Sequence, residues 1–252
     1  MVLPAYNEEA NIGTMIESSL EVLPTLADDY EVIVVDDGSR DGTSAVAEEW
    51  MGRSYPSVRL LVHERNLGYG AAIRTGLQHA TKGLVFYTDA DRQFDVAELT
   101  YFLPMAQDHD LVIGFRVYRY DALLRSMISW VYNQIVGVLF RVRVRDVDCA
   151  FKLMRAEVSD KLPLQTNDFF IDTEIVACAR KWNFRIAQKG VRHYPRVAGE
   201  TTVHPSDVLR TLRTIVRMWR RIYMPTPSQR REAEDINRRV IATEHLPSTI
   251  ES

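Results

Sequence analysis

Short apolar runs, each ending in a polar turn, recur along the first half of the chain. Runs over residues 31–35, 58–62 and 84–88 predict buried strands, and a shorter run at the start predicts another. Helical patterns lie between them, and the first has its apolar residues at Ile12, Ile16, Leu20 and Leu23. Repeated strand–turn–helix units predict an α/β fold, with a mostly parallel, doubly wound sheet and flanking helices.

Polar side chains stand at the ends of these predicted strands. In an open α/β sheet, ligands bind outside the carboxyl ends of the strands, so Tyr6, Asp37, Asn66 and Asp89 should meet at one crevice. Asp89 and Asp91 follow the run at 84–88, and two carboxylates at this spacing can share Mg²⁺ or Mn²⁺ with phosphate and water ligands. An acidic turn that caps the next helix is the alternative.

The second half of the chain has a less regular pattern. It predicts a strand at 110–115, a semi-polar helical segment at 121–140 that lies in an interface or on the core, and a strand after Lys152. A helix should open at 169–174 with Asp172 as its N-cap, followed by a strand at 185–194. The predicted organisation is a catalytic domain over 1–204, an arginine-rich helix over 205–224 and a poorly ordered tail over 225–252.

Composition adds limits on location and partners. The 252 residues suffice for one large α/β domain with an appendage. Two unpaired-looking cysteines favour a reducing compartment, no signal peptide is recognisable, and no apolar stretch is long enough to span a bilayer. The first strand is short, and we expect a few leading residues to be missing.

The net charge of −3 hides two basic segments. Residues 114–145 contain six arginines and one acid, and residues 205–231 contain seven arginines and one acid. Segments this one-sided indicate an anionic partner, with solvated helix faces as the alternative.

Several motifs occur in the order found in family 2 glycosyltransferases with a GT-A fold, namely Val2–Glu8, Val35–Ser39, Asn66–Gly68 and Asp89–Asp91. Later segments resemble the branch of dolichyl-phosphate mannosyltransferase and bacterial polyprenyl-phosphate glycosyltransferases: Gly114–Arg116, the series Arg125, Ser129 and Asn133, Cys149–Lys152, and Arg196–Thr201. The resemblance extends over residues 2–215. It implies inverting transfer of a hexose, mannose or glucose, from a GDP- or UDP-sugar to a dolichyl or undecaprenyl phosphate.

The same resemblance implies roles for particular residues. The base and ribose of the donor would be held by Pro4, Tyr6, Glu8, Val35 and Asp37. The metal and the diphosphate would lie at Asp89, Ala90 and Asp91, with Gln93 as an added metal ligand. Arg116 and Arg196 would bind donor phosphate, and Arg116, Arg125 and Ser129 the acceptor phosphate. Asp89, Asp91 and Arg116 are therefore the candidate catalytic residues.

The chemistry of the acceptor points the same way. A sugar hydroxyl needs a general base, whereas a phosphate monoester, with a second pKa of about 6, is already largely ionised and needs a cationic clamp. The arginines of 114–145 provide such a clamp. Asp148 and Glu174 are the residual candidates for a base, and each has a structural alternative as a turn or helix carboxylate.

Two other function classes remain open. One is a soluble family 2 glycosyltransferase with a sugar or other hydroxyl acceptor, which would need a base. The other is a non-catalytic subunit that binds a nucleotide-sugar, which the intact Asp89/Asp91 pair disfavours. Nothing in the sequence indicates a nucleic-acid partner.

The last predicted helix suggests how the chain meets a lipid. Its apolar stripe comprises Val208, Leu212, Ile215, Trp219 and Ile222, and a neighbouring stripe comprises Arg210, Arg213, Arg217 and Arg220. The helix either lies on an anionic bilayer, with Trp219 and Ile222 among the headgroups, or covers its own domain with the arginines in solvent. We expect a peripheral protein of the cytoplasmic membrane face, or one recruited by a separate membrane subunit.

Overall fold

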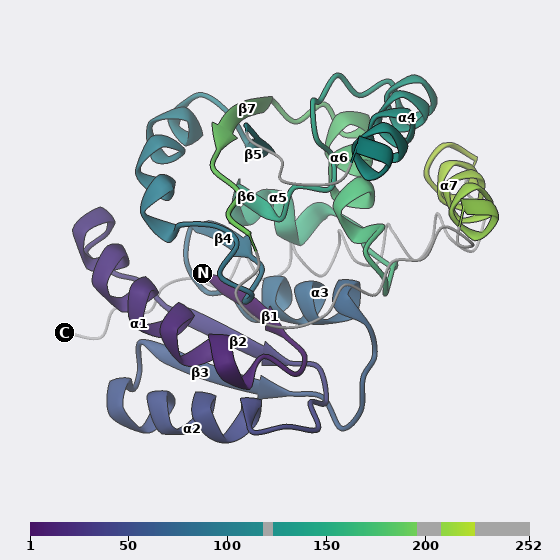
Figure 1. The fold of residues 1–252 in the computed structure, drawn as a ribbon. Coiled ribbons are helices and arrows are strands. Elements are labelled where there is room, and N and C mark those ends of the chain that lie inside the picture. Colours follow the sequence, from purple (N-terminus) through teal and green to yellow (C-terminus); the bar gives the residue numbers. More distant parts are fainter. Residues whose placement is uncertain (118–122, 196–207, 225–252) are drawn as a thin grey trace.

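A computed structural model describes residues 1–117, 123–195 and 208–224, with side chains from 1–117, 130–195 and 213–224 (Figure 1). Its strands form a seven-stranded sheet in the order β3-β2-β1-β4-β6-β5-β7. They are β1 (Val2–Ala5), β2 (Val32–Asp36), β3 (Val58–Val62), β4 (Leu84–Thr88), β5 (Leu111–Arg116), β6 (Phe151–Arg155) and β7 (Ile186–Val191). The strands predicted from the apolar runs are all present.

One strand runs against the others. The pairs β1–β2, β2–β3, β1–β4 and β5–β7 are parallel, whereas β6 lies antiparallel between β4 and β5. In this register Thr88 pairs with Phe151 and Tyr87 with Lys152. The start of β6 therefore lies beside the carboxyl end of β4. The strand order reverses between β4 and its other neighbour, β1.

Helices cover both faces of the sheet, as the doubly wound pattern predicts. One hydrophobic cluster joins the sheet to α1 (Glu9–Leu26), α2 (Thr43–Ser54) and the 3₁₀ helices η1 (Val96–Tyr101) and η2 (Leu103–Gln107). The other joins it to α3 (Tyr69–His79), α4 (Leu123–Phe140), α5 (Ala156–Lys161), α6 (Ile171–Lys181) and α7 (Val208–Tyr223). The fold is thus a sheet between two helical layers.

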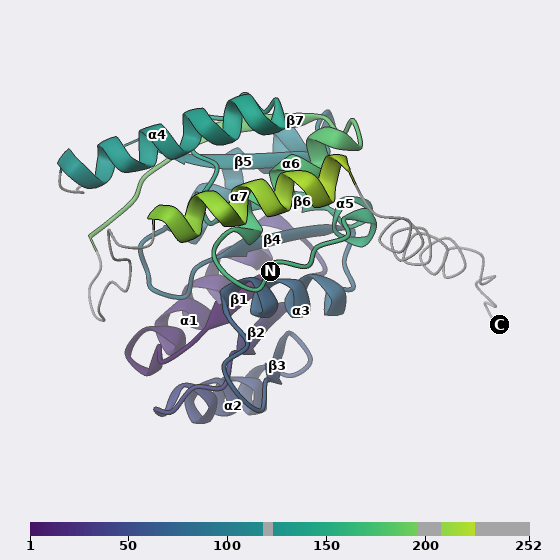
Figure 2. The ribbon, with the colours of Figure 1, turned by 90° about the vertical axis from the view of Figure 1, so that its right-hand side faces the viewer.

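The last helix, α7, packs on its own domain. Ile215, Met218 and Ile222 are buried in the second cluster. Trp219 is part-buried, and its indole Nε1 donates to the Leu139 carbonyl of α4 at 3.0 Å. Figure 2 shows α4 and α7 side by side. The expectation that Trp219 and Ile222 enter lipid headgroups is therefore wrong, because the apolar stripe is used to cover the core.

One local prediction differs from the structure, and two fall at or beyond its described limits. The N-cap of α6 is Phe170, and Asp172 lies inside the first turn, where its carboxylate is buried and hydrogen-bonded by Tyr87 Oη. The last helix is described from Val208, and the predicted start near Pro205 lies outside the described residues. The predicted tail over 225–252 lies outside the described residues.

Candidate active site

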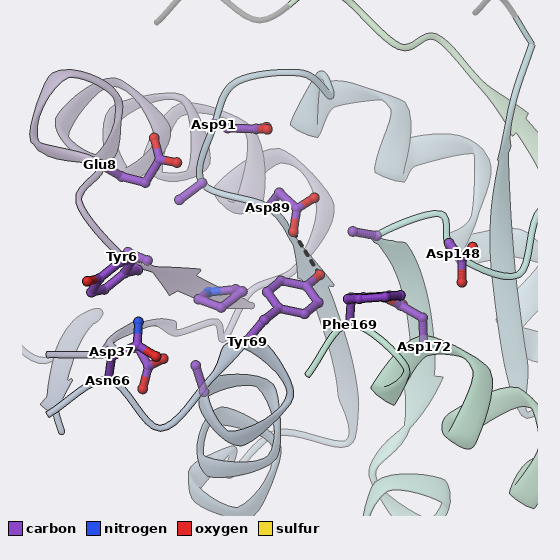
Figure 3. Close-up of a pocket in the computed structure, with 15 residues that line it drawn as sticks. Tyr6, Glu8, Asp37, Asn66, Tyr69, Asp89, Asp91, Asp148, Phe169 and Asp172 are labelled. Atoms are coloured by element: carbon purple, nitrogen blue, oxygen red, sulfur yellow. Dashed lines mark hydrogen bonds between the residues drawn. The ribbon is translucent and has the colours of Figure 1, made fainter. Parts of the chain in front are cut away.

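A cavity of about 390 Å³ lies at the carboxyl ends of β1 and β4, where a doubly wound sheet binds its ligands (Figure 3). Its wall is mostly acidic and aromatic, and its lining contains no lysine, arginine or histidine among the described residues. The lining comprises Pro4, Ala5, Tyr6, Glu8, Asp37, Asn66, Tyr69, Ala72, Asp89, Ala90, Asp91, Asp148, Ala150, Phe169 and Asp172. The predicted crevice residues Tyr6, Asp37, Asn66 and Asp89 are all brought together here.

Tyr6, Glu8 and Asn66 lie at one end of the cavity with Asp37 (Figure 3). Both carboxylate oxygens of Asp37 accept hydrogen bonds, from the backbone N–H groups of Leu67 and Gly68 at 2.9 and 2.8 Å, and Oδ1 also lies 2.7 Å from His63 Nδ1. Asp37 thus fixes the turn that follows β3.

Among the residues predicted to hold the nucleoside, Pro4 lines the cavity beside this end. Val35 does not reach it, because its side chain is fully buried in the hydrophobic core. A nucleoside contact for Pro4, Tyr6, Glu8 or Asp37 remains a prediction, and for Val35 the buried side chain disfavours one.

Asp89 and Asp91 stand together in the wall beyond β4, with Ala90 between them. Burial, followed by the charge of Asp91, raises the pKa of Asp89 to about 8. Tyr69 Oη donates to Asp89 Oδ1 at 2.7 Å, and the Gln93 backbone N–H donates to Asp91 Oδ1 at 3.1 Å. Two partly enclosed carboxylates that destabilise each other's charge are a fitting place for a divalent cation.

The donor set suits Mg²⁺ or Mn²⁺, which prefer carboxylate, phosphate and water oxygens. No group of three or more His, Cys, Asp or Glu side chains within the described part of the chain is arranged to hold a metal alone. Asp89 and Asp91 would therefore hold the ion together with oxygens of the substrate. The side-chain amide of Gln93, the predicted third ligand, donates to the Tyr194 carbonyl at 3.0 Å, and its role in metal binding stays a prediction.

Of the predicted phosphate-binding arginines, Arg116 is the one whose side chain the structure describes, and it is not among the residues that line the cavity. Arg116 forms a bidentate pair with Asp146, with Nε–Oδ2 and Nη2–Oδ1 distances of 2.7 and 2.9 Å. Burial opposes its charge, but the hydrogen bonds and charge of Asp146 more than offset this and raise the pKa of Arg116. Arg196 lies outside the described residues, as do the side chains of Arg125 and Ser129 in α4.

Several wall residues were not predicted as site residues. Asp172 accepts hydrogen bonds from Tyr87 Oη at 2.7 Å and from Lys152 Nζ, and Lys152 is fully buried. This pair places a compensated charge behind the cavity. The antiparallel β6 brings Lys152 and Ala150 to the end of β4, an arrangement that local sequence patterns do not reveal.

The two residual base candidates have different surroundings. Glu174 is fully buried away from the cavity, where it accepts from the backbone N–H of Thr166 at 2.8 Å and pairs with Arg221 of α7. This position fits the alternative role of Glu174 as a structural helix carboxylate. Asp148 instead lines the cavity, and burial followed by the charges of Asp172 and Asp146 raises its pKa to about 7.

The fold and the site define a nucleotide-diphospho-sugar transferase architecture of the GT-A type. A sequence model of glycosyl transferase family 2 matches residues 1–163, and the chain belongs to this family. The predicted family resemblance and fold class are confirmed.

Two proteins of similar sequence carry polyprenyl-phosphate names. The dodecaprenyl-phosphate galacturonate synthase of Rhizobium johnstonii is 30% identical over 220 residues, which cover 86% of this chain and 64% of the relative. The dolichyl-phosphate beta-glucosyltransferase of Dictyostelium discoideum is 26% identical over 238 residues, covering 86% of this chain and 72% of the relative. The chain thus spans less than two thirds of the length of the Rhizobium protein.

A solved structure has the same architecture. Glucosyl-3-phosphoglycerate synthase from Mycobacterium tuberculosis, in complex with Mn²⁺, UDP and phosphoglyceric acid, superposes with a TM-score of 0.62 at 21% identity, over 87% of this chain and 76% of that one. This likeness establishes the fold.

Proposed function

We propose that this protein is a metal-dependent glycosyltransferase that moves a sugar from a nucleotide-sugar to a polyprenyl phosphate. One observation carries the proposal: Asp89 and Asp91 stand side by side in an open cavity at the switch point between β1 and β4. The names of the Rhizobium and Dictyostelium relatives, both polyprenyl-phosphate sugar transferases, support the acceptor class. Those names cover galacturonate and glucose, so they leave the sugar open, and the nucleotide, GDP or UDP, is open as well.

Within this proposal, the two ends of the cavity have different tasks. Tyr6, Glu8 and Asn66 would orient the nucleoside, and Asp89 and Asp91 would hold Mg²⁺ or Mn²⁺ on the diphosphate. The ion supplies positive charge that stabilises the diphosphate leaving group. Tyr69 keeps Asp89 in place through its 2.7 Å hydrogen bond.

The acceptor phosphate needs cations but no base, since it attacks as an anion. Its binding site would include Arg116, Arg125 and Ser129, as the sequence resemblance implies. Arg116 is held by Asp146, so it would act as a fixed positive charge whose guanidinium orientation is already set.

Membrane contact follows from the acceptor, which is a lipid. Among the described residues, none of the helices combines the length and hydropathy needed to cross a bilayer. The exposed arginines of α7 (Arg213, Arg217 and Arg220) and the exposed Trp130 and Val138 of α4 are the candidates for reversible contact with an anionic surface. A location on the cytoplasmic face, or recruitment by a membrane subunit, remains part of the proposal.

A second candidate is transfer to a hydroxyl acceptor. Asp148 favours it, because a cavity carboxyl with a pKa of about 7 is suited to accept a proton near neutral pH. Lipid phosphate would then be unnecessary for activity.

A panel assay separates the two. The full chain is incubated with Mn²⁺ and single GDP- or UDP-sugars, with and without a polyprenyl phosphate, and the lipid product is measured. We expect product only with the lipid phosphate, and Arg125→Ala should raise the acceptor KM much more than the donor KM. Equal effects of Arg125→Ala on both KM values would give Arg125 a donor or structural role. Efficient transfer without the lipid phosphate would support the hydroxyl-acceptor candidate.

A further inference from the structure

The position of the donor sugar follows from the layout of the cavity. In the proposed function the nucleoside binds at the end lined by Tyr6, Glu8 and Asn66, and the diphosphate binds at Asp89 and Asp91. Figure 3 shows these two groups of side chains. The sugar, bonded to the second phosphate, must lie beyond them. Figure 3 shows Phe169 and Asp148 on that opposite side.

Phe169 offers a flat apolar surface at this place. The residue is 46% exposed and lines the cavity, so it presents apolar surface there. Its ring packs on Phe170 with centroids 4.3 Å apart and an interplanar angle of 30°. Phe170 is itself buried and contacts Tyr132 of α4. The ring of Phe169 is therefore held in advance, which suits it to receive the C–H face of a sugar ring.

Asp148 offers a hydrogen-bond acceptor beside it. Its Oδ1 is enclosed and has no hydrogen-bond partner among the described residues. A buried carboxylate oxygen in this state is costly unless a donor reaches it, and sugar hydroxyls are such donors. Asp148 is thus a second, independent feature that indicates a polyhydroxylated ligand at this end.

The surrounding charges select among sugars. Among the described residues, Lys152 contacts this wall, and its charge is already engaged by Asp172. The carboxylates of Asp89, Asp148 and Asp172 line the wall. A sugar carboxylate would meet like charge here, whereas neutral hydroxyls would meet acceptors.

We propose that Phe169 and Asp148 form the donor-sugar subsite and that it selects a neutral hexose over a uronic acid. This inference rests on the proposed function, because it takes the ligand of the cavity to be a nucleotide-sugar. It adds the residues that would select the hexose implied by the sequence resemblance over a uronic acid, the sugar named for the Rhizobium relative.

Calorimetry with the full chain and Mn²⁺ at pH 8, where Asp148 is largely ionised, tests the subsite. The ligands are UDP, UDP-glucose and UDP-glucuronate, and in parallel GDP, GDP-mannose and GDP-mannuronate. In the series that the wild type binds, we expect the hexose to bind at least about tenfold more tightly than the uronate, equivalent to about 1.4 kcal/mol.

Two substitutions assign this preference to the residues. Phe169→Ala should lower the affinity for the nucleotide-hexose about tenfold relative to that for the free nucleotide, and Phe169→Tyr should restore this affinity. Asp148→Asn should reduce the preference for hexose over uronate. Unchanged affinity for the free nucleotide shows in each variant that the fold and the rest of the site are intact.

The inference is overturned if the wild type binds the hexose and the uronate donor equally. It is also overturned if Phe169→Ala leaves the affinity for the hexose donor relative to the free nucleotide unchanged and Asp148→Asn leaves the affinity for hexose relative to uronate unchanged. A wild type that binds none of these ligands would overturn both proposals. If only the proposed function fails, calorimetry will show the expected binding pattern, but the panel assay will show no transfer of sugar to a polyprenyl phosphate.

Discussion

Loss of the Arg221 charge should destabilise the protein far more than loss of the charge of Arg220, the adjacent residue. Arg221 of α7 pairs with Glu174, whose side chain is fully buried, while the side chain of Arg221 is 22% exposed. Removing one partner of a buried ion pair typically costs about 3–5 kcal/mol, because the other charge is left without compensation. Glu174 keeps the backbone N–H groups of Gln165 and Thr166 as donors, so we expect the lower end, about 3 kcal/mol.

Arg221→Met isolates the charge, since methionine keeps most of the aliphatic packing. Arg220→Met is the matched control: Arg220 is the adjacent residue, is exposed, and should change the free energy of unfolding by no more than about 0.5 kcal/mol. Glu174→Gln in the Arg221→Met background should recover about 1–2 kcal/mol, because no buried charge then remains.

Urea unfolding followed by circular dichroism gives these free energies, and a loss of about 3 kcal/mol corresponds to a fall in Tm of about 6–12 °C for a domain of this size. Equal stability of Arg221→Met and Arg220→Met would refute the reasoning. In that case α7 would not be anchored through Glu174, and its role as domain cover would rest on its apolar residues alone.

Three further outcomes are expected. Asp91→Ala should abolish turnover and Mn²⁺-dependent nucleotide-sugar binding with the fold intact by circular dichroism, and near-normal activity of this variant would remove Asp91 from the metal site. The pKa of Asp148 is about 7 in the fold against an ordinary value of 3.8, so between these pH values the carboxyl is protonated in the folded protein and ionised in the unfolded chain. The free energy of unfolding of the wild type therefore falls as pH rises from about 4 to 7. Asparagine does not titrate, so Asp148→Asn should raise Tm relative to wild type more at pH 8 than at pH 5. A difference in Tm that is the same at both pH values would contradict that pKa. Finally, anionic vesicles should co-sediment the protein at low salt and release it as salt rises, and the triple change of Arg213, Arg217 and Arg220 to Glu should weaken binding; absence of binding by the wild type would leave recruitment by a partner as the route to the lipid.

The sequence predicted most of the sheet because buried parallel strands are continuous apolar runs with polar turns at their ends. The place of β6 was not predictable in this way. Its apolar pattern indicates a strand but not its neighbours or direction, and only pairing with β4 reveals that Lys152 lies beside Tyr87. The cavity positions of Asp148 and Asp172 follow from that pairing and from the packing of α6.

The site was predictable where it depends on strand ends. Asp89, Asp91 and Tyr6 come directly after strands, so the general rule for doubly wound sheets places them at the crevice. Val35 lies inside β2, where the apolar run over 31–35 already predicts burial, and its nucleoside role came only from the sequence resemblance. The stripe of α7 predicted an amphipathic helix correctly, but a stripe does not say what covers it. The structure assigns Ile215, Met218 and Ile222 to the domain core.

The most direct test of the account is a comparison of acceptors that differ only in the phosphate. With its preferred nucleotide-sugar and Mn²⁺, the wild type is given a polyprenyl phosphate or the corresponding polyprenol, in the same detergent and at the same concentration. Transfer of radiolabelled sugar to the lipid phosphate, with no product on the polyprenol, is the predicted result. Comparable transfer to the polyprenol, or product formed only on a soluble sugar, would contradict it.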